Sequence, residues 1–107
     1  MTTVPMRASA VAASVLLMAV FTQQDAVADQ SRGRALAERQ CSQCHGVGRG
    51  EKSPYEGVSS FTEIAAEPAI TEDSLRAFLK TSHPPTPDLI IKPADIDDLV
   101  SYIASLR

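Results

Sequence analysis

The sequence predicts an all-α protein, and three observations support that fold class. Stretches of good helix formers alternate with loops rich in glycine and proline. Several of these stretches begin at a residue whose side chain can cap a helix N-terminus. No run shows the alternation of apolar and polar residues that is typical of a strand. The chain has 107 residues and a net charge of −3, so we expect one domain that binds neither nucleic acid nor anionic lipid.

The first 28 residues have the pattern of a cleaved secretion signal. Arg7 ends a weakly positive region, and residues 8–21 form an apolar run of 14 residues without a charge. A membrane-spanning helix needs about 20 apolar residues, so an uncleaved anchor is the weaker alternative. The small-x-small tripeptide at residues 26–28 predicts cleavage before Asp29, export to the periplasm and no membrane insertion after cleavage. The mature domain is then expected to comprise residues 29–107.

This mature domain is small and contains no methionine. Its 79 residues keep the net charge of −3, because Arg7 and Asp25 are the only charged residues that cleavage removes. A domain of that size usually needs disulfides, a metal or a cofactor to supplement its core. The three methionines all precede the cleavage site: Met1, Met6 and Met18.

The first expected helix covers residues 31–40, with Asp29 or Ser31 as its N-cap. Residues 46–60 contain four glycines and Pro54, which predicts a loop.

Two short helices are expected next. Ser60 and Glu63 have the spacing of a capping box, which predicts a helix over residues 61–66. Thr71 is an N-cap candidate for a helix that runs to about Lys80. Three apolar residues fall on one face of this second helix: Leu75, Phe78 and Leu79.

The last expected helix begins at Pro93, after a loop over residues 83–88 that contains three prolines. Apolar residues with helical spacing then continue almost to Arg107: Ile96, Leu99, Val100 and Ile103. Three acids lie near the positive end of this helix: Asp95, Asp97 and Asp98. Stabilisation of the helix N-terminus accounts for them, and an acidic docking patch is the alternative.

The chemistry of the chain centres on Cys41, Cys44 and His45. The spacing lets all three side chains face one object at the end of the first helix. Cys-x-x-Cys-His is the attachment signature of c-type haem, in which two thiols add to the vinyl groups and the histidine binds the iron. Export agrees with this interpretation, because such haem is attached outside the cytoplasm.

Three other interpretations of these cysteines remain open. A Cys41–Cys44 disulfide would close too short a loop to stabilise the fold much. A thioredoxin-like pair would need a preceding strand, whereas a helix is predicted there. A zinc site from Cys41, Cys44 and His83 would have unusual ligand spacing.

The mature chain resembles the small bacterial monohaem class I cytochromes c. The resemblance rests on the Cys-Ser-Gln-Cys-His motif, a glycine-bearing first helix with Leu36, and the final helix. It implies a cytochrome c-like bundle of about 3–5 helices wrapped around one covalently attached haem. It also implies that the first and last helices cross closely, with Gly33 against Tyr102.

The resemblance assigns roles to further residues. His45 takes the role of the proximal iron ligand, with its ring oriented by a carbonyl for which Pro54 is the candidate. Pro54, Phe61 and Tyr102 are expected in the haem pocket or in the packing around it.

One position departs from the family. Thr86 stands where such proteins carry the methionine that is the second axial ligand, and a neutral hydroxyl binds haem iron poorly. His83, three residues earlier, is one replacement. An open or water-bound iron is another, and Lys80 or Lys92 are further alternatives.

Two functions therefore remain. The first is a single-haem electron carrier, a monomer that meets redox protein partners transiently and is not an enzyme. The alternative is a ligand-binding or weakly peroxidatic haem protein with an open iron site.

Overall fold

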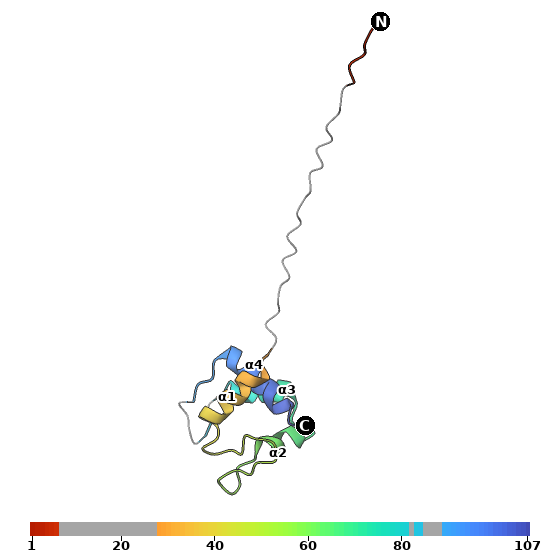
Figure 1. Ribbon diagram of the computed structural model, residues 1–107. Helices are drawn as coiled ribbons and strands as arrows, with labels where there is room; N and C mark the ends of the chain where they lie inside the picture. The colour runs from red at the N-terminus through yellow and green to blue at the C-terminus, as the bar shows by residue number, and fades with distance from the viewer. Residues whose placement is uncertain (7–27, 82, 85–88) are drawn as a thin grey trace.

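The computed structural model describes residues 1–6, 28–81, 83–84 and 89–107, and this part of the chain contains four helices and no strand. The helices are α1 (Gln30–Gln40), α2 (Phe61–Ala66), α3 (Glu72–Leu79) and α4 (Pro93–Ala104), joined by loops (Figure 1). The all-α prediction is therefore confirmed. No helix in these ranges has the length and apolar character needed to cross a membrane.

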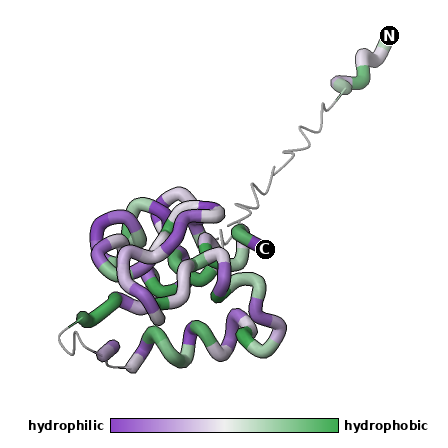
Figure 2. The backbone as a smooth tube through the Cα atoms, turned by 90° about the horizontal axis from the view of Figure 1, so that it is seen from below, coloured by the Kyte–Doolittle hydropathy of each residue, from purple (hydrophilic) through white to green (hydrophobic). Residues whose placement is uncertain are grey.

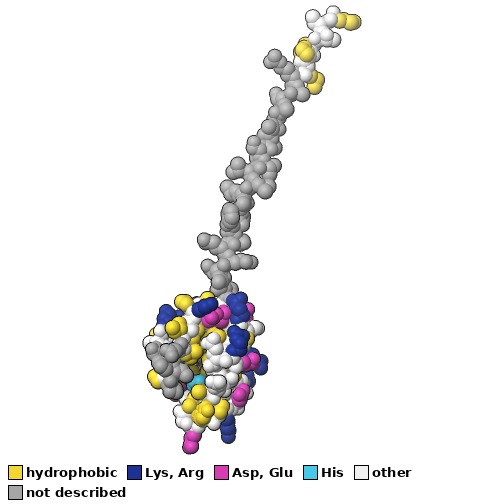
Figure 3. Space-filling model, turned by 90° about the vertical axis from the view of Figure 1, so that its left-hand side faces the viewer, with side chains coloured by type: hydrophobic (Ala, Val, Ile, Leu, Met, Phe, Trp, Pro, Cys, Tyr) yellow, Lys and Arg dark blue, Asp and Glu magenta, His cyan; other side chains and the backbone are white. Residues whose placement is uncertain are grey.

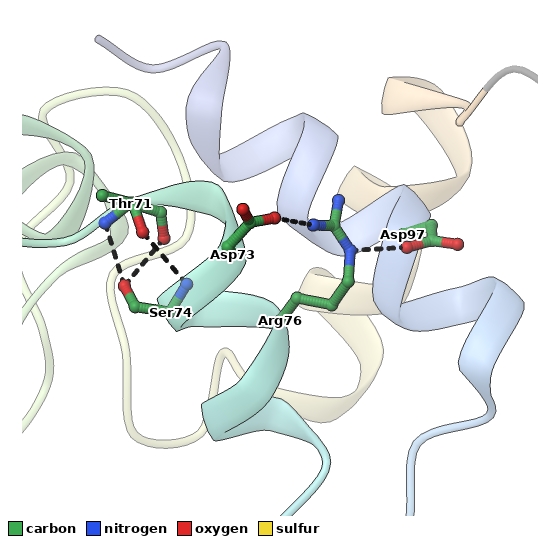
Figure 4. Close-up of polar contacts among 5 residues, drawn as sticks. All are labelled: Thr71, Asp73, Ser74, Arg76 and Asp97. Atoms are coloured by element: carbon green, nitrogen blue, oxygen red, sulfur yellow. Dashed lines mark hydrogen bonds and ion pairs between the residues drawn. The ribbon is translucent and has the colours of Figure 1, made fainter.

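Side-chain caps determine where three of the helices begin. Asp29, and not Ser31, caps α1, because its carboxylate accepts hydrogen bonds from the backbone N–H groups of Ser31 and Arg32. Ser60 and Glu63 form the predicted capping box of α2. Thr71 caps α3 through a reciprocal pair of hydrogen bonds with Ser74 (Figure 4).

Among the helices described, α1 and α4 share the most extensive contact, and they approach closely where they cross. A Cβ atom built on Gly33 would overlap the backbone carbonyl oxygen of Asp98 and lie 2.9 Å from the Cβ of Tyr102. The predicted contact between Gly33 and Tyr102 is therefore confirmed, and only glycine lets the two helices approach this closely. The Tyr102 hydroxyl donates to the carbonyl of Val47 at 2.6 Å, which attaches the loop after α1 to this crossing.

The core lies where α4 packs against α1, α2 and the loop between them. In the coloured part of the tube, hydrophobic and hydrophilic stretches alternate (Figure 2). The buried cluster consists of Leu36, Ala37, Val47, Phe61, Ala65, Leu99, Tyr102, Ile103 and Leu106. α3 contributes no buried residue to it.

Two of the three aspartates in α4 connect this helix to its neighbours. Asp97 accepts from Arg76 of α3 at 2.8 Å, and Arg76 also donates to Asp73 (Figure 4). Asp98 is 6% exposed and accepts from the backbone N–H of Asp29 at 2.7 Å. Asp95 remains in the first turn of α4, where an acid stabilises the helix N-terminus, while Asp97 and Asp98 in addition contact other elements.

Candidate haem-attachment site

The cysteine motif forms the turn that ends α1. Cys41 is the C-cap residue, and its backbone N–H donates to the carbonyl of Ala37 at 2.9 Å. The carbonyl of Cys41 then accepts from the N–H groups of both Cys44 and His45, at 3.1 and 2.9 Å. These two hydrogen bonds to the Cys41 carbonyl close a tight turn, so Cys41, Cys44 and His45 stay close together.

Both cysteines of the motif are half-buried free thiols. Burial, with a smaller contribution from Cys44, raises the pKa of the Cys41 thiol to about 11. A thioredoxin-like pair needs a lowered thiol pKa, so this environment argues against that interpretation. In the described part of the chain no three His, Cys, Asp or Glu side chains are grouped as metal ligands, so the zinc set with His83 is not formed there.

The ring of His45 is oriented by a backbone carbonyl. Its Nδ1–H donates to the carbonyl oxygen of Ser59 at 2.6 Å, which leaves Nε2 with a free lone pair. The assignment of Pro54 to this role is wrong, because the bond is to Ser59, while Pro54 is exposed. A hydrogen bond of this kind fixes the tautomer and the ring angle that a metal-binding histidine needs.

The position of Ser59 follows from how the loop returns to the motif. The backbone N–H of Phe61 donates to the carbonyl of Gly46 at 2.8 Å, which holds the start of α2 beside the motif. Gly46 is needed there, since a Cβ on it would overlap the carbonyl oxygen of Glu51. Nothing local in the sequence reveals the bond between His45 and Ser59, because the two residues are 14 positions apart.

Two rings lie close to that of His45. Phe61, which is buried, has its ring centre 5.5 Å from that of His45. The ring centre of His83 is 6.0 Å from that of His45, with 38° between the planes. Phe78 meets His83 edge-on at 5.4 Å and 84°. The motif histidine, the loop histidine and two phenylalanines from α2 and α3 are therefore brought together.

The apolar face of α3 lies beside these rings and is incompletely covered by protein. Leu75 and Leu79 are half-buried against the core, whereas the side chain of Phe78 is 49% exposed. Figure 3 shows a histidine side chain at the surface with hydrophobic side chains gathered beside it. Tyr102, in contrast, belongs to the α1–α4 crossing.

Three further residues are relevant to the second axial position of the iron: Thr86, Lys80 and Lys92. Thr86 lies outside the described residues. Lys80 is the exposed C-cap of α3, and Lys92 is the exposed N-cap of α4.

The residues present fit a covalently attached haem. Two free thiols lie three positions apart beside an imidazole whose Nε2 is available, and a half-exposed apolar face lies next to them. The described residues therefore supply the attachment, ligation and apolar contact that such a group requires.

Comparisons with known proteins agree with this geometry. Residues 30–107 match the cytochrome c family. The chain is 33% identical over 93 residues to cytochrome c-552 of Bradyrhizobium diazoefficiens, an alignment that covers 87% of this chain and 89% of that protein. No solved structure matches it. With the helical fold and the Cys-x-x-Cys-His turn, these matches show that the chain belongs to the cytochrome c family, as a small class I monohaem protein whose cofactor is covalent haem c.

Proposed function

We propose that this haem electron carrier is exported to the periplasm, where it passes single electrons between other redox proteins. In this proposal Cys41 and Cys44 hold the porphyrin through thioether bonds, and His45 Nε2 binds the iron. When bound, the haem supplies an iron that alternates between the ferrous and ferric states. The observation that carries the proposal is the bond from His45 Nδ1–H to the Ser59 carbonyl, because it presents Nε2 as a ligand in a fixed orientation.

The surroundings of His45 suit electron transfer better than catalysis. Its ring contacts the buried Phe61 on one side, and the described polar contact of its Nδ1 is to a backbone carbonyl. An enzyme that activates peroxide needs a general acid-base or a charged group beside the iron. Among the described residues His83 has its ring centre 6.0 Å from that of His45, and an imidazole at this distance can serve as an iron ligand.

Export is supported by the N-terminal sequence and by where the domain starts. The weakly positive region, the 14-residue apolar run and the small-x-small tripeptide occur in the order of a signal peptide. Cleavage before Asp29 would leave the α1 cap intact, because Asp29 itself is the N-cap residue. We propose that the mature chain acts as a monomer with transient redox protein partners.

A ligand-binding haem protein is the second candidate, and Thr86 is the observation that favours it. A chain without methionine after residue 28 has no thioether to occupy the second axial position. An open iron would bind carbon monoxide rapidly, whereas an iron with two protein ligands would not.

Haem attachment is the first expected result. Protein exported from a host competent in c-type maturation should keep its haem through acid-acetone extraction and denaturing electrophoresis. Cys41→Ala and Cys44→Ala should each lose one thioether, visible as a shift of the pyridine haemochrome band. Gln43→Ala is the matched control, because this exposed residue lies between the cysteines and should leave the band unchanged. Colourless protein would contradict the attachment, and a potentiometric titration that is not reversible with one electron would contradict the carrier function.

A further inference from the structure

The distance between the centres of the His45 and His83 rings is compatible with two imidazoles bound to opposite sides of one metal. Metal–imidazole bonds of about 2.0 Å, with roughly 1.1 Å from nitrogen to ring centre, place two opposed imidazole centres about 6.2 Å apart. The ring centres of His45 and His83 are 6.0 Å apart. The 38° between their planes is compatible with this arrangement, because two imidazoles bound to one metal need not be coplanar.

The chain around His83 directs its ring toward this position. α3 ends at Leu79, and the Thr81 hydroxyl donates to the carbonyl of Phe78 at 2.6 Å, which continues local hydrogen bonding just beyond the helix end. The edge-on contact with Phe78 restrains the ring itself. Pro84 further restricts the backbone of His83 to extended conformations. The half-buried His83 ring is therefore held beside His45 by α3 and by the proline that follows.

We propose that His83 is the second axial ligand of the haem iron, opposite His45. The proposal rests on the proposed function, since it requires a haem held at Cys41, Cys44 and His45. The proposal accounts for the absence of a methionine ligand, because an imidazole would then occupy the second axial position in place of a thioether sulfur or water. The two lysine alternatives have no recorded contact with His45, and both are exposed at helix ends.

A bis-imidazole site has consequences that distinguish it from an open one. Both oxidation states should be low-spin, and the ferric spectrum should lack the weak long-wavelength band of methionine sulfur. The reduction potential should be lower than in His/Met relatives, because the Met/His pair raises it. The ferrous protein should bind carbon monoxide slowly or not at all.

The test compares the purified holoprotein with His83→Ala and with Lys80→Ala as the matched control. His83→Ala should convert the haem to a high-spin spectrum with fast carbon monoxide uptake, and added imidazole should restore the low-spin spectrum. Lys80→Ala should leave every spectrum unchanged. Should His83→Ala not fold, the near-infrared charge-transfer band of the unmutated ferric protein still separates two imidazoles from imidazole with lysine or water.

Failure of this proposal differs from failure of the proposed function. Covalently bound haem with a spectrum unaffected by His83→Ala, or a high-spin unmutated protein, would overturn His83 ligation and leave the carrier intact. Protein without haem would overturn both.

A separate observation concerns the predicted N-terminus of the mature chain. The backbone nitrogen of Asp29 lies 2.7 Å from Oδ1 of Asp98, whose side chain is almost completely buried. Arg32 Nε lies 3.0 Å from the other carboxylate oxygen. Cleavage before Asp29 would convert this nitrogen from a peptide N–H to an ammonium group.

The charges around this nitrogen favour an additional cation. Arg32 faces three acids: Asp98 and Asp95 from α4, and Asp29 from the start of its own helix. The cluster therefore has an excess of negative charge before cleavage, and an ammonium group at Asp29 would reduce it. The bond to Arg32 and the bond to the Asp29 N–H already lower the pKa of Asp98, so this carboxylate is ionised near neutral pH.

We propose that signal removal completes the α1–α4 crossing, because the new ammonium group of Asp29 forms an ion pair with the buried carboxylate of Asp98. A charge-assisted hydrogen bond is roughly twice as strong as a neutral one. The pair should therefore stabilise the processed domain beyond what the peptide N–H provides. This second proposal rests on the predicted cleavage site and not on the haem ligands.

The test compares two exported holoproteins, the native chain and a chain with Gly-Ser inserted between Ala28 and Asp29. The insertion moves the ammonium group two residues away and leaves a peptide N–H at Asp29. At pH 6 the native chain should have an unfolding equilibrium constant about tenfold smaller, from the difference between charged and neutral hydrogen bonds.

The pH dependence of this difference has a definite sign. Asp98 should raise the pKa of the ammonium above the roughly 7.7–8.0 of a free α-amino group, so its stabilisation is complete below that range. The difference should disappear near pH 11, once the ammonium has lost its proton, and should be absent when both chains carry Asp98→Asn. Equal stability at pH 6, a difference that persists at pH 11, or a mature N-terminus other than Asp29 would overturn the proposal.

Discussion

Replacing Cys41 and Cys44 together with alanine is expected to abolish cooperative unfolding of the domain. The apolar side of α3 has no complete protein cover, since Leu75 and Leu79 are half-buried and Phe78 is half-exposed. Full burial of one such side chain contributes about 1.5–3 kcal/mol, whereas a whole domain is stable by only about 5–15 kcal/mol. A chain that cannot attach the porphyrin loses this contribution at several positions at once.

Circular dichroism at 222 nm during a thermal scan measures the effect. The double variant should show reduced helicity and a broad, non-cooperative decline. Ser42→Ala is the matched control, because the Ser42 hydroxyl makes only an exposed local bond to the carbonyl of Glu38. A double variant with native helicity and a sharp transition would show that the side chains alone maintain the fold.

Gly33→Ala is expected to destabilise the holoprotein by about 3 kcal/mol or more, the upper range of overpacking effects. The added Cβ would overlap the carbonyl oxygen of Asp98, which is backbone and cannot rotate away. The helices must separate, and this strains the bond from the Tyr102 hydroxyl to Val47. The better helix propensity of alanine offsets only about 1 kcal/mol of the cost.

Chemical denaturation followed by haem absorbance measures this change. Arg34→Ala is the control on the adjacent exposed position, where only an i,i+4 ion pair with Glu38 is lost. That variant should change the free energy of unfolding by less than about 0.5 kcal/mol. A Gly33→Ala protein as stable as the control would contradict the close crossing of α1 and α4.

Sequence reasoning predicted those parts of the fold that depend on local contacts. The capping box of Ser60 and Glu63 involves residues three positions apart, and Thr71 caps α3 in the same way. Pro93 likewise begins α4 because the fixed φ angle and the missing N–H of proline suit the first position of a helix. The close approach at Gly33 is a long-range feature, and it was predicted only through the resemblance to a family.

Contacts between distant residues were missed because no local pattern encodes them. The Ser59 carbonyl meets His45 only after the loop has folded back, and Pro54 was preferred for its type and not for its position. From the sequence, Asp98 could equally be an exposed acid near the N-terminus of the last helix. Only the packed structure shows that its side chain is buried and accepts a hydrogen bond from the backbone of Asp29. Within the candidate site, the motif was therefore predictable, whereas the group that orients its histidine was not.

The crossing of α1 and α4 also has a consequence for the order of events during biogenesis. The helix that carries the cysteine motif at its end packs against the last helix of the chain, so this contact joins residues far apart in the sequence and cannot form before the end of the chain is available. If the chain is exported as proposed, its N-terminal part, with the cysteine motif, would cross the membrane before α4 does. Until α4 arrives, α1 would lack the helix against which it packs, and both thiols would be accessible for haem attachment. The topology thus allows covalent modification to precede folding.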